Sequence, residues 1–213
     1  MSIKAVYTKF TMPHFVRNRL VSGESLKSHR SRIDSGFMHR YLNGDQILEI
    51  GGTGDGKGVP ITDSAINIDL GYPGYDGRTL PFADGSQDAV YTSHCLEHID
   101  DFRNVLQDWF RVLKVGGYLI VIVPHQLLCE KKVTQPSRFA GHQHKRFYLP
   151  STLLNEIQTS LPLTEWRLRH MRENDDDFDY DIPPHIHSIG SYEIECVIQK
   201  IPQYKYLNEM LSE

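Results

Sequence analysis

Two carboxylates stand near the ends of short apolar runs, which is where an α/β sheet meets its ligand. Glu49 lies in the run Ile47–Ile50 ahead of a glycine-rich loop, and Asp69, twenty residues after Glu49, follows the run Ala65–Ile68. In nucleotide-binding α/β folds, an acid after the second strand at about this interval accepts hydrogen bonds from both ribose hydroxyls. The two runs therefore predict parallel strands whose ends bind a nucleotide-like ligand.

The loop after the first run reads Gly51-Gly52-Thr53-Gly54-Asp55-Gly56, and its spacing argues against two common nucleotide sites. The dinucleotide fingerprint needs glycines at offsets 0, 2 and 5, which no frame of this loop supplies. A phosphate loop fits as far as Lys57, but Gly58 replaces the magnesium-binding hydroxyl and Pro60 interrupts the helix that should follow. Glycines still allow positive φ and let a ligand approach main-chain N–H groups closely.

The loop resembles that of class I methyltransferases that use S-adenosyl-L-methionine. Glu49 and Gly51 match the family pattern E-x-G-x-G-x-G, although Thr53 and Asp55 replace its second and third glycines. The remaining glycines form a copy of the pattern shifted by one residue. The choice of amides that face the ligand therefore stays open.

The resemblance becomes more specific further along the chain. Residues 76–90 are similar to the segment D-x-x-x-L-P-F-x-D-x-S-x-D-x-V of small-molecule methyltransferases, and residues 93–99 are similar to S-x-x-L-E-H-I. Residues 111–119 match the junction R-x-L-K-x-G-G-x-L of the same family. The resemblance covers residues 46–125 strongly and residues 140–157 weakly.

This resemblance implies S-adenosyl-L-methionine as the cofactor and assigns Asp76 to the adenine amino group. The segment Leu80-Pro81-Phe82 offers an apolar wall for the base, with core packing as the alternative. Ser93 and His94 follow a predicted strand and are expected near the methionine part of the cofactor or near the acceptor. The expected cofactor-binding residues are Glu49, Gly51, Gly52, Thr53, Gly54, Asp69, Leu70, Asp76, Gly77, Ser93 and His94.

A polar connection rich in His, Lys and Arg follows the fourth predicted strand, and such segments often cover active sites. His144, His142 and His125 are candidates for the general base on an acceptor hydroxyl, because imidazole titrates near neutral pH. His142 and His144 alternate as on a strand, but no carboxylate obviously accompanies them, so no metal site is predicted. Glu97 and His98 are expected to form a hydrogen-bonded pair that fixes the turn into the next helix.

The elements that must position these residues follow an α/β order. Strands are predicted at 47–50, 65–70, 89–92 and 118–123, helices at 25–42, 100–114 and 151–157, and an antiparallel hairpin at 163–171 and 191–201. The first crossover helix looks short or replaced by a loop, and the third βα unit looks abbreviated or lost. The predicted fold is α/β, a Rossmann-like doubly wound and mostly parallel sheet with a C-terminal antiparallel hairpin, in three α/β/α layers.

Residues 1–44 are the most basic part of the chain, with eight Lys or Arg against two acids, and form a predicted helical extension. Its basic side chains either make a solvated outer face or, through His29, Arg30 or Arg32, reach an anionic group of the substrate. The apolar residues that share one face of the helix, and are expected to pack on the sheet, are Leu26, Ile33, Phe37 and Tyr41.

The methyltransferase domain is expected to span residues 45–205, including a cover segment at 130–150. Six acids crowd into residues 173–181, which predicts a solvated loop because like charges resist burial. The alternatives for this segment are a divalent-ion site or a homodimer contact with the basic N-terminal region. No repeat or second domain is indicated.

The bulk properties exclude several classes of protein. With 213 residues and 39% hydrophobic content, the chain can form one sizeable core. A net charge of −4 argues against a broad nucleic-acid surface. No apolar run approaches the ~18 residues of a membrane span, and three scattered cysteines without C-x-x-C spacing fit a reducing cytoplasm.

The predicted function is methyl transfer from S-adenosyl-L-methionine to a small polar acceptor. A hydroxyl of a sugar, or of a polysaccharide or glycolipid precursor, is favoured because the abbreviated architecture and basic extension resemble methyltransferases of that chemistry. One alternative is N- or C-methylation of a small metabolite. An alternative of another class is an inactive cofactor-binding scaffold or regulator, suggested by Thr53 and Asp55 in place of glycines.

Overall fold

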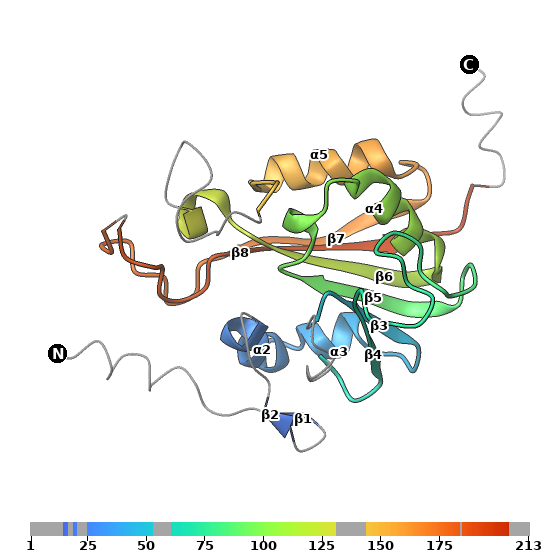
Figure 1. The fold of residues 1–213 in the computed structure, drawn as a ribbon, viewed down its shortest axis with the longest axis horizontal. Helices are drawn as coiled ribbons and strands as arrows, with labels where there is room; N and C mark the ends of the chain where they lie inside the picture. The colour runs from blue at the N-terminus through green and yellow to red at the C-terminus, as the bar shows by residue number, and fades with distance from the viewer. Residues whose placement is uncertain are drawn as a thin grey trace.

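The computed structural model describes residues 15–16, 19–20, 25–52, 61–130, 144–183 and 185–204 (Figure 1). Three predicted site residues, Thr53, Gly54 and His142, lie outside these ranges, so their roles stay predictions. None of the helices in these ranges combines the length and the apolar composition needed to cross a lipid bilayer.

A six-stranded sheet forms the centre of the molecule, in the order β4-β3-β5-β6-β8-β7. Its strands are β3 (Ile47–Ile50), β4 (Ala65–Ile68), β5 (Gln87–Ser93), β6 (Leu113–Pro124), β7 (Trp166–Asn174) and β8 (Glu193–Lys200). Strands β3 to β6 are mutually parallel, whereas β8 pairs antiparallel with both β6 and β7. The predicted Rossmann-like sheet with its C-terminal antiparallel hairpin is therefore confirmed.

Helices cover both faces of this sheet, which gives the predicted three layers (Figure 1). On one face lie α4 (Phe102–Arg111) and α5 (Pro150–Ser160), and on the other lie α2 (Ser25–Asp34) and α3 (Phe37–Tyr41). Strand β3 serves both cores because its side chains alternate: Leu48 packs in the cluster of Trp109, and Ile47 packs in the cluster of Phe37. The other described elements are β1 (Phe15–Val16), β2 (Arg19–Leu20), the 3-10 turn η1 (Leu96–His98) and the π-helix η2 (Gln126–Glu130).

The connections around β4 are short. Segment 69–86 is described throughout and contains only turns and loops between β4 and β5, which confirms the predicted loss of the third βα unit. Residues 51–64 connect β3 to β4, and the described part of this connection holds no helix. The edge of the sheet beside β4 is therefore built from loops.

The helix predicted at 100–114 is shorter in the structure. It ends at Arg111, and β6 begins two residues later, at Leu113. Lys114 therefore lies in β6, where it binds the carboxylate of Asp88 at 2.5 Å.

The predicted helix at 25–42 is divided into α2 and α3. Gly36 adopts φ of +75°, a left-handed conformation that interrupts the helical hydrogen bonds. Phe37 and Tyr41 are buried against the sheet as predicted, but Ile33 is 37% exposed because the break separates its face from theirs. The short α3 therefore makes the apolar contact with the sheet, whereas α2 is held to the sheet by polar side chains.

A buried ionic cluster attaches α2 to the first residues of β8. Arg32 is only 2% exposed, and its Nη2 and Nε donate to Glu193 Oε2 at 2.6 Å and to Glu195 Oε1 at 2.9 Å. The hydroxyl of Ser28 also donates to Glu193 at 2.6 Å. Arg32 therefore neither lies on a solvated face nor reaches outward to a substrate, and both predicted roles for it were wrong.

The acidic segment also contacts the N-terminal helices. Asp176 accepts a hydrogen bond from Ser31 of α2 at 3.3 Å and pairs with Arg172 at 2.5 Å. The hydroxyl of Tyr180 donates to Asp175. Part of the predicted solvated loop is thus docked on α2 of the same chain.

Replacing Arg32 with methionine should lower the free energy of unfolding by about 3–5 kcal/mol, because two buried glutamates would lose their partner. Urea unfolding followed by circular dichroism measures this change. The matched control is R103M, since Arg103 is exposed on α4, and it should change stability by less than about 0.5 kcal/mol. An R32M variant within about 1 kcal/mol of the wild type would contradict the role assigned to the cluster.

Candidate functional site

The carboxyl ends of the parallel strands meet at one edge of the sheet. Ile50 of β3 lies beside Ile68 of β4 and beside Thr92 of β5 in register. Open α/β sheets bind their ligands at this edge. The predicted site residues that come directly after these three positions are Gly51, Asp69 and Ser93.

The turn after β3 is tightly packed. Gly51 has φ of +75°, and a Cβ built on it would lie 2.6 Å from the Sγ of Cys95. A Cβ on Gly52 would lie 2.8 Å from the Nδ2 of Asn67. The backbone of this turn therefore sits between β4 and the segment that follows β5, and the position of Gly51, with its positive φ, requires glycine.

Glu49 orders the loop that returns from this turn to β4. Its side chain is buried, and Oε2 accepts the N–H of Ile61 at 2.5 Å. Burial raises the pKa of Glu49 to about 7, although the hydrogen bond from Ile61 opposes the shift. The observed contact is with the loop, and the predicted direct contact with a cofactor stays a prediction.

Asp69 and Leu70 lie beside the turn that contains Asp76 and Gly77. Asp69 is partly exposed and accepts the N–H of Leu70, while the side chain of Leu70 is 74% exposed. A Cβ on Gly77, which has φ of +86°, would lie 2.9 Å from the Cδ2 of Leu70. An acid next to an uncovered apolar side chain can bind a ribose and the flat base attached to it.

Asp76 closes its own turn. Its Oδ1 accepts the N–H groups of Arg78 and Thr79 at 2.8 and 2.7 Å, and these bonds lower the pKa of the carboxyl group. Leu80 is only 2% exposed and belongs to the core, so core packing is the correct alternative for this residue. The adenine contact assigned to Asp76 stays a prediction.

His94 lies directly after β5 in a strained conformation. Its φ is +51°, which is uncommon for a residue with a side chain and is often found at functional sites. Its Nε2 is 3.0 Å from Oε1 of Glu193, the first residue of β8, which pairs with Pro124 at the end of β6. The strand order therefore places Glu193 at the same edge of the sheet as His94.

Glu193 holds the ring of His94 in place. Burial alone would raise the pKa of Glu193, but the charge of Arg32 and the hydrogen bond to His94 hold that pKa well below its usual range. An ionised carboxylate only accepts hydrogen bonds, so Nε2 of His94 is the donor in this contact. The other ring nitrogen, Nδ1, lies 3.9 Å from Oε1 of Glu97.

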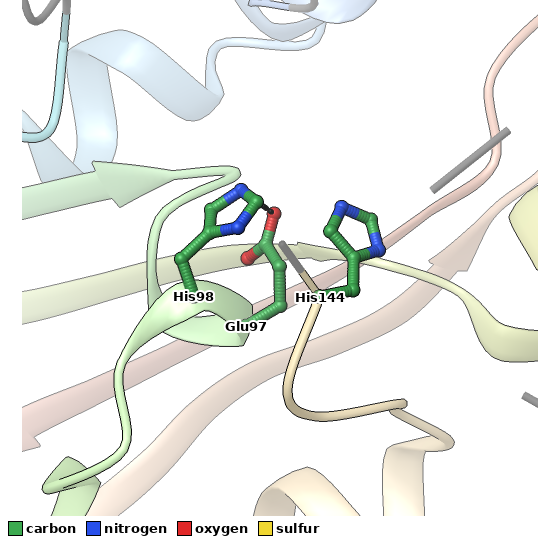
Figure 2. A group of neighbouring side chains, drawn as sticks. All are labelled: Glu97, His98 and His144. Atoms are coloured by element: carbon green, nitrogen blue, oxygen red, sulfur yellow. Dashed lines mark ion pairs between the residues drawn. The ribbon is translucent and has the colours of Figure 1, made fainter. Parts of the chain in front are cut away.

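Glu97, His98 and His144 form a second group at this edge (Figure 2). Figure 2 shows the carboxylate of Glu97 beside the ring of His98, and the centroids of the His98 and His144 rings are 4.9 Å apart. The distance from His98 Nε2 to Glu97 Oε1 is 3.6 Å, so the predicted hydrogen bond between these residues is not formed. The segment of His144 is held close because Lys145 and Arg146 donate their N–H groups to the main-chain carbonyl of Glu97.

His125 has a different environment from the other predicted catalytic residues. It is 4% exposed, and its Nδ1 accepts the N–H groups of Leu127 and Leu128 at the start of η2. Burial lowers its pKa, and the nearby carboxylate of Glu173 partly opposes this shift. These contacts favour a structural role for His125 over its predicted role as a base.

The sequence prediction missed the contribution of β8 to this edge. Glu193 and Glu195 alternate with Ile194 and Cys196 in a strand that otherwise looks apolar. This alternation of period two was a signal that one face of the strand carries buried charge. Their partner, Arg32, lies more than 160 residues away along the chain, so pattern alone did not identify it.

Comparisons with known proteins agree with this geometry. Residues 66–121 match the family model described as a methyltransferase domain. A stretch of 46 residues is 56% identical to demethylmenaquinone methyltransferase of Corynebacterium efficiens and covers 22% of this chain and 20% of the relative. Ajmaline N-methyltransferase of Rauvolfia serpentina is 30% identical over 60 residues, which cover 28% of this chain and 19% of the relative. The chain thus spans about a fifth of the length of these curated relatives.

Solved structures extend the likeness to most of the fold. A putative methyltransferase from Bacillus halodurans superposes with a TM-score of 0.54 at 13% identity and covers 79% of this chain and 98% of the other. An S-adenosylmethionine-dependent methyltransferase from Aquifex aeolicus gives a TM-score of 0.52 at 15% identity, over 80% of this chain and 93% of the other. Residues 66–121 are thus similar to a methyltransferase domain, and the chain has the fold of solved S-adenosylmethionine-dependent methyltransferases.

Proposed function

We propose that this protein transfers a methyl group from S-adenosyl-L-methionine to a small polar acceptor. The observation that carries the proposal is the meeting of the Gly51 turn, Asp69 with the uncovered Leu70, and His94 at one edge of the sheet. Asp69 would bind the ribose hydroxyls, Leu70 and Gly77 would contact the adenine, and the amides of the turn would face the methionine part.

The proposed location of the protein is the cytoplasm, because its three cysteines are free thiols, as is usual in a reducing compartment.

The favoured acceptor is a hydroxyl group of a sugar or of a saccharide precursor. Glu193 and Glu97 lie next to His94, and His98 lies next to Glu97, so charged and polar side chains are available for an acceptor with many hydroxyl groups. The curated relatives named above act, by their names, on a quinone precursor and on an alkaloid nitrogen. C- or N-methylation of a small metabolite is therefore the second candidate.

His94 is our candidate for the general base of the reaction. Bound S-adenosyl-L-methionine would supply an electrophilic methyl group to an acceptor oxygen held in line with it, and the hydroxyl proton would have to leave. Nδ1 of His94 takes that proton, while Glu193 holds Nε2 and stabilises the charged ring that forms. The products are a methyl ether, S-adenosylhomocysteine and a proton that is released later.

Asp69→Ala should weaken binding of S-adenosyl-L-methionine at least about tenfold, because a hydrogen bond to a charged group contributes about 1.5–3 kcal/mol. Isothermal titration calorimetry measures the affinity. The control is Asp45→Ala, an exposed acid just ahead of β3 and so at the opposite edge, which should bind as the wild type does. Equal affinity in D69A and wild type would refute the assigned ribose contact.

Product analysis tests the proposed acceptor. The wild-type protein, with methyl-labelled cofactor, is offered separate pools of sugars and sugar nucleotides, of quinone precursors and of small amines. We expect label and a mass increase of one methylene group in the saccharide pool, located on oxygen by fragmentation. Label in the quinone or amine pool alone would favour the second candidate, and cofactor binding without turnover in any pool would favour an inactive scaffold.

The substitution His94→Asn should lower the rate of methyl transfer to the acceptor by about 10²–10⁴-fold, because it removes the proposed general base. The affinity for the cofactor should change little. Asparagine is chosen because it tolerates the left-handed backbone that His94 adopts. His185→Ala, at an exposed position of the described chain, is the control for loss of a histidine. Turnover of H94N within about threefold of the control would show that another group accepts the proton.

A further inference from the structure

We propose that Glu97, His98 and His144 bind a divalent transition-metal ion, with Zn²⁺ as the favoured ion. Their ligand atoms all lie within 4.8 Å of one another, and the three residues come from two segments of the chain (Figure 2). Two imidazoles and one carboxylate are a common ligand set for zinc and for other first-row metals when further positions stay open. Among the described residues, no other group of three or more such side chains is close enough to hold an ion.

Glu97 provides the strongest support. Its side chain is fully buried, and neither carboxylate oxygen has a hydrogen-bond partner among the described residues. A buried carboxylate without hydrogen bonds is costly, so such groups are normally paired or bound to a metal. Ligand atoms of both imidazole rings lie within 4.8 Å of this carboxylate, so an ion bound to all three side chains would satisfy it.

The distance between the side chains of Glu97 and His98 fits two ligands of one ion better than it fits a hydrogen bond. Glu97 Oε1 lies 3.6 Å from His98 Nε2, which exceeds hydrogen-bond length. Two ligands that are each about 2.1 Å from a tetrahedral zinc ion lie roughly 3.4 Å apart. The ligand atom of His144 lies within 4.8 Å of those of Glu97 and His98.

The backbone holds the three ligands in place. Glu97 and His98 lie on η1, directly after β5, and the Glu97 carbonyl accepts the N–H groups of Lys145 and Arg146. The Arg146 guanidinium donates to the carbonyl of Ile99 at 2.6 Å and to Glu156 of α5 at 3.1 Å. The segment of His144 is therefore fixed to η1 before any ion binds.

The ion would anchor the acceptor, and this part of the inference rests on the proposed function. His98 is 36% exposed at its side chain and His144 is half-buried, so one side of the group is open. An acceptor oxygen in the open position would become more acidic and would lie close to His94, whose Nδ1 is 3.9 Å from Glu97. His144 would then be a ligand, in place of the predicted role as a general base.

Titration of the full-length protein with metal alone tests the proposal. Protein is stripped with EDTA, dialysed, checked by circular dichroism and titrated with Zn²⁺ in a calorimeter and with Co²⁺ in a spectrophotometer. We expect one equivalent to bind and the visible Co²⁺ bands to show nitrogen and oxygen ligands. Affinity should fall at least tenfold in both His98→Ala and His144→Ala, which remove partly exposed side chains.

Exposed histidines elsewhere provide the matched controls. His39→Ala on α3 and His185→Ala should bind the ion as the wild type does, because both side chains are exposed and outside the group. Glu97→Gln keeps the shape of the buried side chain and should also lose at least tenfold in affinity. Wild-type protein that binds neither ion, or H98A and H144A variants that bind as tightly as the controls, would overturn the proposal.

A parallel measurement separates this inference from the proposed function. Binding of S-adenosyl-L-methionine is measured with metal-free protein, and binding of Zn²⁺ is measured without cofactor. Cofactor binding without metal binding would overturn the metal site and leave the methyltransferase proposal intact. Metal binding without cofactor binding would support the site and count against the proposed function.

Discussion

The in-register parallel pairing of β3 with β4 and β5 is the constraint on which the candidate site depends. Because Ile50, Ile68 and Thr92 lie side by side, the residues that follow them must emerge at one edge of the sheet. A slip of one residue would turn every side chain of a strand to the other face. Both cores prevent such a slip, since Ile47 and Leu48 are fully buried on opposite faces.

A buried charge network connects this edge to the N-terminal helices. Arg32 of α2 binds Glu193 and Glu195, and Glu193 in turn holds His94. Replacing all the members of a buried ionic cluster by apolar residues is often neutral for stability, although removing one member alone is costly, so we ascribe the network to position as much as to stability. Through Glu193, α2 thus helps to fix the orientation of the His94 ring.

The sequence was sufficient for the parts of the fold that depend on local pattern. Apolar runs predicted β3 and β4, the acid after the second run predicted Asp69 at a strand end, and the alternating late segments predicted the antiparallel hairpin. Contacts between distant segments were not predictable in this way. The burial of Arg32 requires Glu193, and the distance between Glu97 and His144 depends on a loop that returns to η1. The helix break at Gly36 was missed because the apolar spacing continues across it.

A crystal structure with S-adenosylhomocysteine would test the central claim, that the carboxyl edge of the parallel strands is the cofactor site, most directly. We expect ribose hydroxyls within hydrogen-bond distance of Asp69, adenine against Leu70, and the sulfur atom near the Gly51 turn and His94. Ligand bound elsewhere, with Asp69 and Leu70 untouched, would show that this edge is not the cofactor site.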